Sequence, residues 1–287
     1  MSESPAASPV AAPVATPAPS AASKAKSKKR KAQDGNQATP NPNKKAKAGK
    51  HEITDDSLLD LEAGVNTSFS RMDPPLLADY VARQAKRFGT DLSPVELSDL
   101  YISANAIRDT TTFAATRTKE NLPDFLEEFA AEDGKEGKEK EEAKKRLGGT
   151  PPKNGAPHTI VVTGGGLRAA DLVRASRKFQ RKGNVVSKLF AKHFKVEEQV
   201  RFLAKNKTGI AIGTPARLMD LLDNDAAGAL SVEHLKRIVV DASHIDQKKR
   251  GVLDMKDTMM PLAKWLTRKE FKDRYIDEEK HLDLLFF

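Results

Sequence analysis

Two segments of the sequence combine residue types that could handle phosphate groups. The first, Gly213-Thr-Pro-Ala-Arg-Leu218, follows a short apolar run and places proline where a helix begins. A helix starting there would direct free N–H groups, the Thr214 hydroxyl and the Arg217 guanidinium toward an anion, such as a phosphate of a nucleic-acid backbone. The alternative is that Arg217 pairs with a nearby acid, Asp220 or Asp223.

The second segment is built around Asp241, which ends the apolar run 237–241. A carboxylate at the carboxyl end of a parallel strand lies where nucleotide chemistry commonly takes place, although Asp241 could instead cap the following turn. Three adjacent cations, Lys248, Lys249 and Arg250, follow shortly afterwards. Neighbouring like charges repel one another, so we expect this loop to contact RNA or protein.

A glycine-rich segment, 164–169, formally matches the G-x-G-x-x-A fingerprint of dinucleotide-binding folds. That fingerprint requires an acid at the end of the next strand, and the run 185–191 contains none. A tight strand-to-helix turn is therefore favoured over the use of NAD or S-adenosylmethionine. The sequence has no cysteine, no histidine pair with metal-ligand spacing and no G-x-S-x-G elbow. We expect no catalytic residue, cofactor, metal or small-molecule substrate.

The elements that position these residues follow an α/β pattern from residue 158 onward. Short apolar runs alternate with amphipathic segments, which predicts a parallel sheet with helices on both faces. The expected strands are 159–163, 185–191, 209–213, 237–241 and 282–287, and the expected helices are 167–179, 196–205, 215–222 and one that includes 259–266. We assign these elements to one domain, 158–287.

Residues 56–130 predict a helical arm, with helices within 73–88, 92–101 and 122–129. Asp73 and Ser93 are suited to cap the first two. Residues 131–157 mix both charges without an apolar face and then run into glycine and proline, so we assign them to a charged linker.

Residues 1–55 predict a disordered basic tail, because this stretch has too little apolar surface to offset its chain entropy. Ten basic and two acidic residues lie within 1–50, so the net charge of +9 belongs mostly to the tail. Dense basic clusters of this kind indicate nuclear import, although the tail could be merely solubilising. The signal comprises Lys26, Lys28, Lys29, Arg30, Lys31, Lys44, Lys45 and Lys47. Neither a secretory signal nor a membrane span is indicated.

The order of these segments resembles the first RecA-like domain of DEAD-box RNA helicases. Residues 163–169 stand at the position of the P-T-R-E-L element, 213–218 at that of T-P-G-R-L, and 241–244 at that of D-E-A-D. The resemblance implies a single RecA-like domain of the P-loop-NTPase type, in which the T-P-G-R-L helix start meets the RNA backbone.

Several departures from that pattern argue against hydrolysis. Ala242 replaces the glutamate that would activate water, His244 replaces the last aspartate, and Gly165 replaces an arginine. The G-x-x-x-x-G-K-[ST] loop is absent from the sequence, and its expected place falls within 131–157. Without that loop nothing cradles the phosphates, so an ATP-dependent RNA helicase is only the alternative.

Three longer segments, 58–66, 99–111 and 241–255, resemble the Cms-type nucleolar proteins, a degenerate helicase-like family of the small-subunit processome. This resemblance covers about residues 56–287. It implies a non-enzymatic ribosome-biogenesis factor in the nucleus and nucleolus that binds pre-ribosomal RNA and small-subunit assembly factors. We expect a monomer within a large ribonucleoprotein, with no membrane partner.

Overall fold

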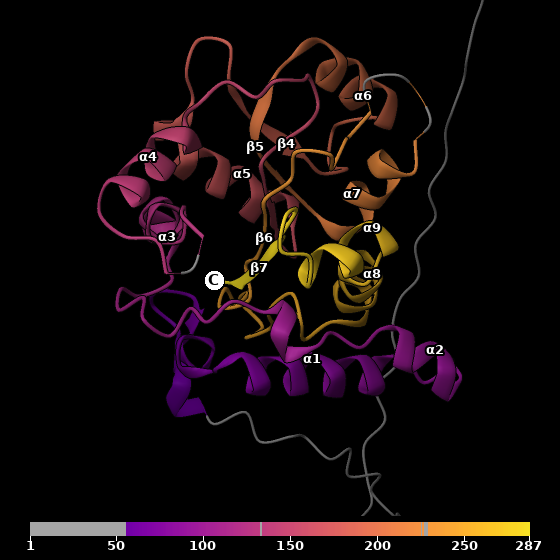
Figure 1. Ribbon diagram of the computed structural model, residues 1–287. Coiled ribbons are helices and arrows are strands. Elements are labelled where there is room, and N and C mark those ends of the chain that lie inside the picture. The colour runs from indigo at the N-terminus through magenta and orange to yellow at the C-terminus, as the bar shows by residue number, and fades with distance from the viewer. Residues whose placement is uncertain (1–55, 133, 225, 227–228) are drawn as a thin grey trace, which may run out of the picture. The chain divides into compact units, whose positions relative to one another are not determined.

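A five-stranded parallel sheet organises the described part of the chain (Figure 1). The computed structural model describes residues 56–287 except 133, 225, 227 and 228. The strand order is β4-β5-β3-β6-β7, and all four neighbouring pairs are parallel. The strands are β3 (Thr159–Val162), β4 (Val185–Leu189), β5 (Thr208–Gly213), β6 (Arg237–Val240) and β7 (Asp283–Phe286). The predicted α/β fold with a parallel sheet is confirmed.

Helices cover both faces of this sheet, as the sequence predicted. Side chains alternate between the faces of a strand, so Ile160 and Val162 of β3 join one core while Val161 joins the other. The first core is covered by α1 (Pro74–Phe88), α6 (Val196–Lys205), α7 (Pro215–Leu222) and α8 (Lys256–Leu266). The second core is covered by α3 (Leu122–Glu128), α4 (Lys138–Leu147) and α5 (Gly166–Ala175). Both layers are visible in Figure 1.

Local capping explains why the helices before the sheet begin where the sequence predicted. The Asp73 carboxylate accepts a hydrogen bond from the Leu76 N–H at the start of α1. Ser93 and Glu96 form a reciprocal capping box at the start of α2 (Pro94–Asp99). A further short helix, α9 (Lys269–Lys272), follows α8 and was not predicted.

Two features of the part before residue 158 differ from the prediction. A two-stranded antiparallel sheet, β1 (Leu59–Asp60) with β2 (Val65–Asn66), lies in a segment that was expected to be helical only. Residues 131–157 contain helix α4. Ion pairs at helical spacing, such as Glu141–Lys144, stabilise this helix. Its last residue, Leu147, is buried and supplies the apolar anchor that the linker prediction overlooked.

The segment after α2 packs directly against the edge of the sheet. Ile107 forms a parallel bridge with Leu284 of β7, and the Arg108 N–H donates to the Leu284 carbonyl at 2.9 Å. Residues 56–287 belong to one compact unit. The predicted boundaries between arm, linker and domain stay a prediction, and the arm supplies part of the sheet's packing.

Candidate functional site

The strand order reverses between β3 and β6. The chain leaves β3 toward β4 on one side, whereas β6 leads to β7 on the other. Open parallel sheets bind ligands at the carboxyl ends of their strands at such a switch point. Thr163 and Asp241 directly follow these two strands, so the candidate site lies there.

The Asp241 carboxylate is fully occupied by side chains of this chain. Thr163 Oγ1 donates to Asp241 Oδ2 at 2.6 Å. Arg168, on the first turn of α5, donates from Nε to Oδ2 at 3.0 Å and from Nη2 to Oδ1 at 2.9 Å. The Asp241 side chain is 0% exposed and that of Arg168 is 10% exposed. This is a buried, bidentate ion pair that bridges the ends of the two central strands.

The electrostatics of the pair keep Asp241 ionised. Burial by itself would raise the pKa of this carboxyl, but the charge and hydrogen bonds of Arg168 outweigh burial and leave the pKa lowered. The neighbouring His244 is partly buried, and burial lowers its pKa. Asp241 is therefore held as an anion matched to the Arg168 cation.

Backbone contacts close the segment around Asp241 further. The N–H groups of Ala242 and Ser243 both donate to the Phe287 carbonyl at 2.8 Å. His244 forms an antiparallel bridge with Val65 of β2. The Ala242 side chain, at the position that the helicase resemblance gives to a glutamate, is 1% exposed and carries no polar group.

A second buried guanidinium lies beside this edge of the sheet. Arg117 is 1% exposed, and its donors reach the carbonyl oxygens of Phe69, Phe286 and Thr110 at 3.2, 2.8 and 2.9 Å. Burial lowers the pKa of Arg117 to about 10. Arg117 thus ties the segment before α3 to the end of β7, next to the strand that ends at Asp241.

Residues 131–157, where the phosphate loop of the helicase pattern was expected, do not lie at the carboxyl ends of the strands. His158, Arg237 and Asp283 stand at the amino ends of β3, β6 and β7, and they line one cavity with α4. The linker segment therefore lies at the amino ends of the strands, whereas Asp241 lies at their carboxyl ends. The segment that runs parallel to β7 before a loop and a helix is the one around Ile107.

The structure places Thr214 and Arg217 at the start of α7, as predicted, but orients the arginine inward. Arg217 is 6% exposed, and its Nη1 donates to Gln199 Oε1 at 2.6 Å and to the Phe194 carbonyl at 3.0 Å. Its Nε lies 3.5 Å from Asp220 Oδ2, which is the pairing that the sequence left open as an alternative. The Thr214 side chain is half-buried and makes no capping hydrogen bond.

The cationic loop is exposed and partly ion-paired. Lys249 Nζ lies 2.7 Å from Asp56 Oδ2, and Arg250 Nη2 lies 2.8 Å from Asp246 Oδ2. The Lys248 side chain is exposed, while its N–H donates to Asp246. These residues lie beyond β6, whereas Thr214 and Arg217 follow β5. The predicted nuclear-import residues fall outside the described part of the chain.

Arg168 and Arg117 were not among the residues predicted from the sequence. Arg168 was visible as the only cation in the glycine-rich turn, but pairing it with Asp241 requires knowing that β3 and β6 are neighbours. Arg117 lies in a stretch without regular secondary structure, where periodicity gives no signal. Among the described residues no group of three or more potential metal ligands comes together, and no helix is long and apolar enough to cross a membrane.

Fold and site together define a doubly wound α/β protein whose switch-point carboxylate is held in an internal ion pair. Comparison with known proteins gives the family. A family model described as "CMS1: U3-containing 90S pre-ribosomal complex subunit" matches residues 15–287. The chain belongs to this CMS1 family, which supports a role in ribosome biogenesis.

Individual relatives agree with this assignment. Protein CMS1 of Chaetomium thermophilum is 60% identical over 259 residues, which cover 90% of this chain and 96% of the relative. Protein cms1 of Schizosaccharomyces pombe is 31% identical over 196 residues, covering 68% and 64%. Among solved structures, the yeast DEAD-box splicing factor Prp28 matches 46% of this chain and 28% of its own, at 18% identity and a TM-score of 0.32. The fold assignment rests on the sheet topology described above.

Proposed function

We propose that this protein is a non-enzymatic assembly factor of the early small-subunit pre-ribosome, in which a helicase-like domain serves as a binding module. The observation that carries the proposal is the bidentate pair between Arg168 and Asp241. In phosphoryl-transfer enzymes the corresponding carboxylate holds Mg²⁺ on the nucleotide phosphates. Here a metal ion would have to displace a guanidinium from a buried site.

Other features support the loss of ATP hydrolysis. Ala242 supplies no general base, and the loop between Ile107 and α3 contains no glycine, while its one lysine, Lys119, follows Thr118 and not the glycine of a G-K-[ST] sequence. Family descriptions also name a pre-ribosomal subunit and not a helicase. The alternative, an ATP-dependent RNA helicase, would need phosphate clamping that this sequence does not supply.

Contact with pre-ribosomal RNA and assembly proteins forms the second half of the proposal. The Lys248–Arg250 loop carries three exposed cations, of which Lys249 and Arg250 are ion-paired with Asp56 and Asp246 at the surface. Thr214 offers a free hydroxyl at a helix start, and Arg217 supports that start from inside through Gln199. We propose that RNA or protein docks on the loop, with Thr214 contributing where RNA reaches α7. The basic tail would direct the chain to the nucleus and nucleolus.

Calorimetry with Mg²⁺·ATP tests the enzymatic half. We expect no heat of binding at micromolar nucleotide from the purified full chain, and the same result for Asp241→Ala. Micromolar affinity that Asp241→Ala abolishes would establish a working nucleotide site and overturn the proposal.

Sedimentation of pre-ribosomes tests the docking half. The variant with Lys248, Lys249 and Arg250 all changed to Glu should shift from early small-subunit particles to the free fraction, because charge reversal repels RNA phosphates. The control reverses Lys256 and Lys264 of α8, which are also exposed. Full co-sedimentation of the triple variant would remove the loop from the docking surface.

A further inference from the structure

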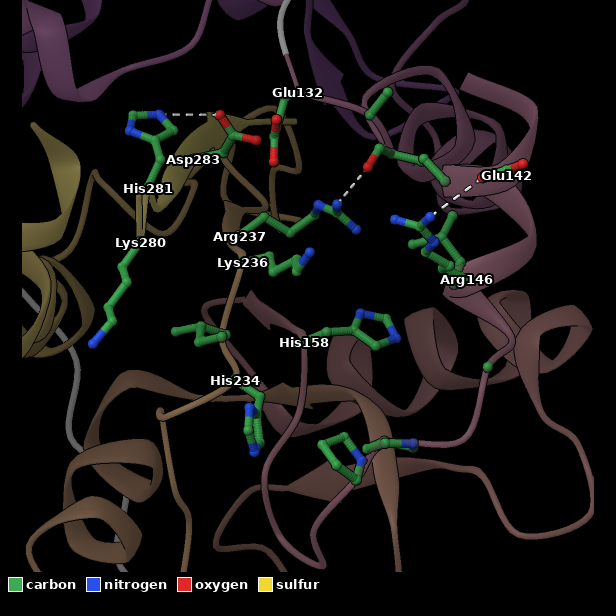
Figure 2. Close-up of a pocket in the computed structure, with 18 of the residues that line it drawn as sticks. Glu132, Glu142, Arg146, His158, His234, Lys236, Arg237, Lys280, His281 and Asp283 are labelled. Carbon is green, nitrogen blue, oxygen red and sulfur yellow. Dashed lines mark hydrogen bonds and ion pairs between the residues drawn. The ribbon is translucent and has the colours of Figure 1, made fainter. Parts of the chain in front are cut away.

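A cavity of about 620 Å³ lies at the amino ends of the central strands, opposite to the Asp241 edge (Figure 2). Its size is within the range of ligand pockets in proteins. Its walls come from α4, from the strand starts at His158, Arg237 and Asp283, and from the loop that precedes β7. The cavity plays no part in the function proposed above.

Two charged residues that line this cavity, Arg237 and Asp283, are each 6% exposed. Arg237 Nη2 donates to the Ala130 carbonyl at 2.6 Å and its Nη1 to Thr159 Oγ1 at 3.3 Å, while its Nε has no hydrogen-bond partner among the described residues. Both acceptors of Arg237 are neutral oxygen atoms. A buried cation that lacks a paired anion is unfavourable, and it retains capacity to bind one.

The lowered pKa of Arg237 agrees with an incompletely compensated charge. Burial lowers the pKa of Arg237 to about 10, with Asp283 opposing the shift. The Asp283 carboxylate itself is engaged elsewhere, at 3.2 Å from Arg108 Nη1 and 3.5 Å from His281 Nε2. Lys236, beside Arg237, adds an exposed ammonium group at the same wall. This wall of the cavity is suited to receive a carboxylate or a phosphate.

The charges at the rim of the cavity favour a carboxylate ligand over a phosphate ligand. The lining combines six glutamates with other cations, and three of the glutamates are ion-paired: Glu132 with Lys135, Glu142 with Arg146 and Glu233 with Lys153. Among the described residues no ion pair is found for the other three, Glu139, Glu278 and Glu279. These three carboxylates would repel a polyanionic RNA backbone, whereas a peptide can place one acidic side chain inside and basic residues at the edge. Ile276, between the lining residues Arg274 and Glu278, is 75% exposed and offers an apolar contact to a protein.

We propose that this cavity is a docking site for a protein segment that inserts an aspartate or glutamate side chain against Arg237 and Lys236, and that carries flanking lysine or arginine residues facing the rim glutamates. The partner would be another protein of the particle in which this chain assembles, so in cells the proposal rests on the assembly function proposed above. An RNA occupant is the competing outcome.

Site-directed photo-crosslinking of the full chain in cells tests this proposal. The photoreactive residue p-benzoylphenylalanine replaces the exposed rim residue Glu279, and the same residue in place of Lys86 on α1 serves as a control for the opposite part of the unit. Particles are isolated through the tagged chain, irradiated and separated into protein and RNA adducts. We expect a protein adduct at position 279, mapped by mass spectrometry to a segment with an acidic residue between basic ones.

Two further substitutions in the crosslinking chain separate binding from folding. Lys236→Gln changes an exposed side chain and should lower the adduct yield several-fold, while Arg237→Met should lower it about tenfold, the effect of losing about 1.4 kcal/mol of charge-assisted hydrogen bonding. Yields are normalised to the folded fraction from urea denaturation.

The outcomes are distinct. An RNA adduct alone, or no adduct above the Lys86 control in particles that contain the chain, would overturn the docking proposal and leave the assembly function intact. Failure of the chain to co-sediment with particles would instead count against the assembly function. An adduct whose yield Lys236→Gln and Arg237→Met both leave unchanged would also overturn the proposal, because the cations would then play no part.

Discussion

Removing the Arg168 guanidinium while keeping Asp241 tests whether the candidate nucleotide site is closed from within. The Arg168→Met variant loses two hydrogen bonds to a carboxylate that is 0% exposed, leaving only the Thr163 hydroxyl as a donor. Breaking a buried ion pair by removing one partner costs about 3–5 kcal/mol of the free energy of unfolding. We expect a loss of this size at pH 7, measured by urea denaturation.

The ion pair also determines how the free energy of unfolding depends on pH. In the wild type the pKa of Asp241 is lowered in the folded state, so its contribution to stability is complete above the unfolded value of about 3.9 and is lost only as the pH falls through the lower folded pKa. Between pH 7 and pH 5 this contribution is therefore constant.

In Arg168→Met the pKa of Asp241 should rise, because burial is no longer opposed. The folded variant then takes up a proton more readily than the unfolded chain, and its stability increases as the pH falls. Each unit of pKa above the unfolded value corresponds to about 1.4 kcal/mol. The difference between wild type and variant should therefore shrink from pH 7 to pH 5.

A double variant completes the test. Replacing both partners, Arg168→Met with Asp241→Leu, leaves no unpaired charge and should recover stability to within about 1–2 kcal/mol of the wild type. A loss below about 1 kcal/mol for Arg168→Met, unchanged between the two pH values, would show that the pair does not form in solution. The switch point would then be open, and the reasoning behind a closed site would fail.

Three further predictions concern other parts of the chain. Gly213→Ala should destabilise the fold by about 3 kcal/mol in urea denaturation, because a Cβ there would collide with the Leu189 carbonyl oxygen, whereas Gly165→Ala, with open space around its Cβ, should be neutral. Burial and the Arg237 charge lower the pKa of His158 to about 3, so stability should fall by up to about 1.4 kcal/mol per pH unit from pH 6.5 toward 3, and His158→Gln should remove that slope. Deleting residues 1–50 should leave the melting temperature unchanged while abolishing nuclear accumulation of a fluorescent fusion; normal nuclear entry would contradict the import signal.

The sheet was predictable because its strands are continuous apolar runs. Residues 159–162 and 237–240 are buried along their whole length, and such strands stand out in a sequence without any knowledge of their neighbours. Helix starts were equally local, since Asp73 and Ser93 cap through residues only three positions away. These predictions depended on information within about one helical turn.

The missed features depend on longer range or on very short elements. β1 and β2 have two residues each, too few to show alternation. Arg168 and Asp241 are 73 positions apart, and their contact follows from the adjacency of β3 and β6. Helix α4 did carry a local signal, the i,i+3 and i,i+4 spacing of its opposite charges, but its lack of an apolar stripe concealed it.

Three largely buried arginines near the strand ends of one sheet show how the same side chain can serve different purposes. Arg168 neutralises a carboxylate through a bidentate pair, and Arg117 uses four hydrogen bonds to hold the chain before α3 against β7. Arg237 makes two hydrogen bonds, both to neutral acceptors, and lines a cavity. A guanidinium has five N–H donors, so Arg237 retains more unused capacity than Arg117 does. At the carboxyl ends of the strands, where nucleotide chemistry is expected for this fold, the Asp241 carboxylate is thus saturated by internal contacts. The unused donors of Arg237 lie at the amino ends of the strands, so the domain offers a binding surface there in addition to the Lys248–Arg250 loop.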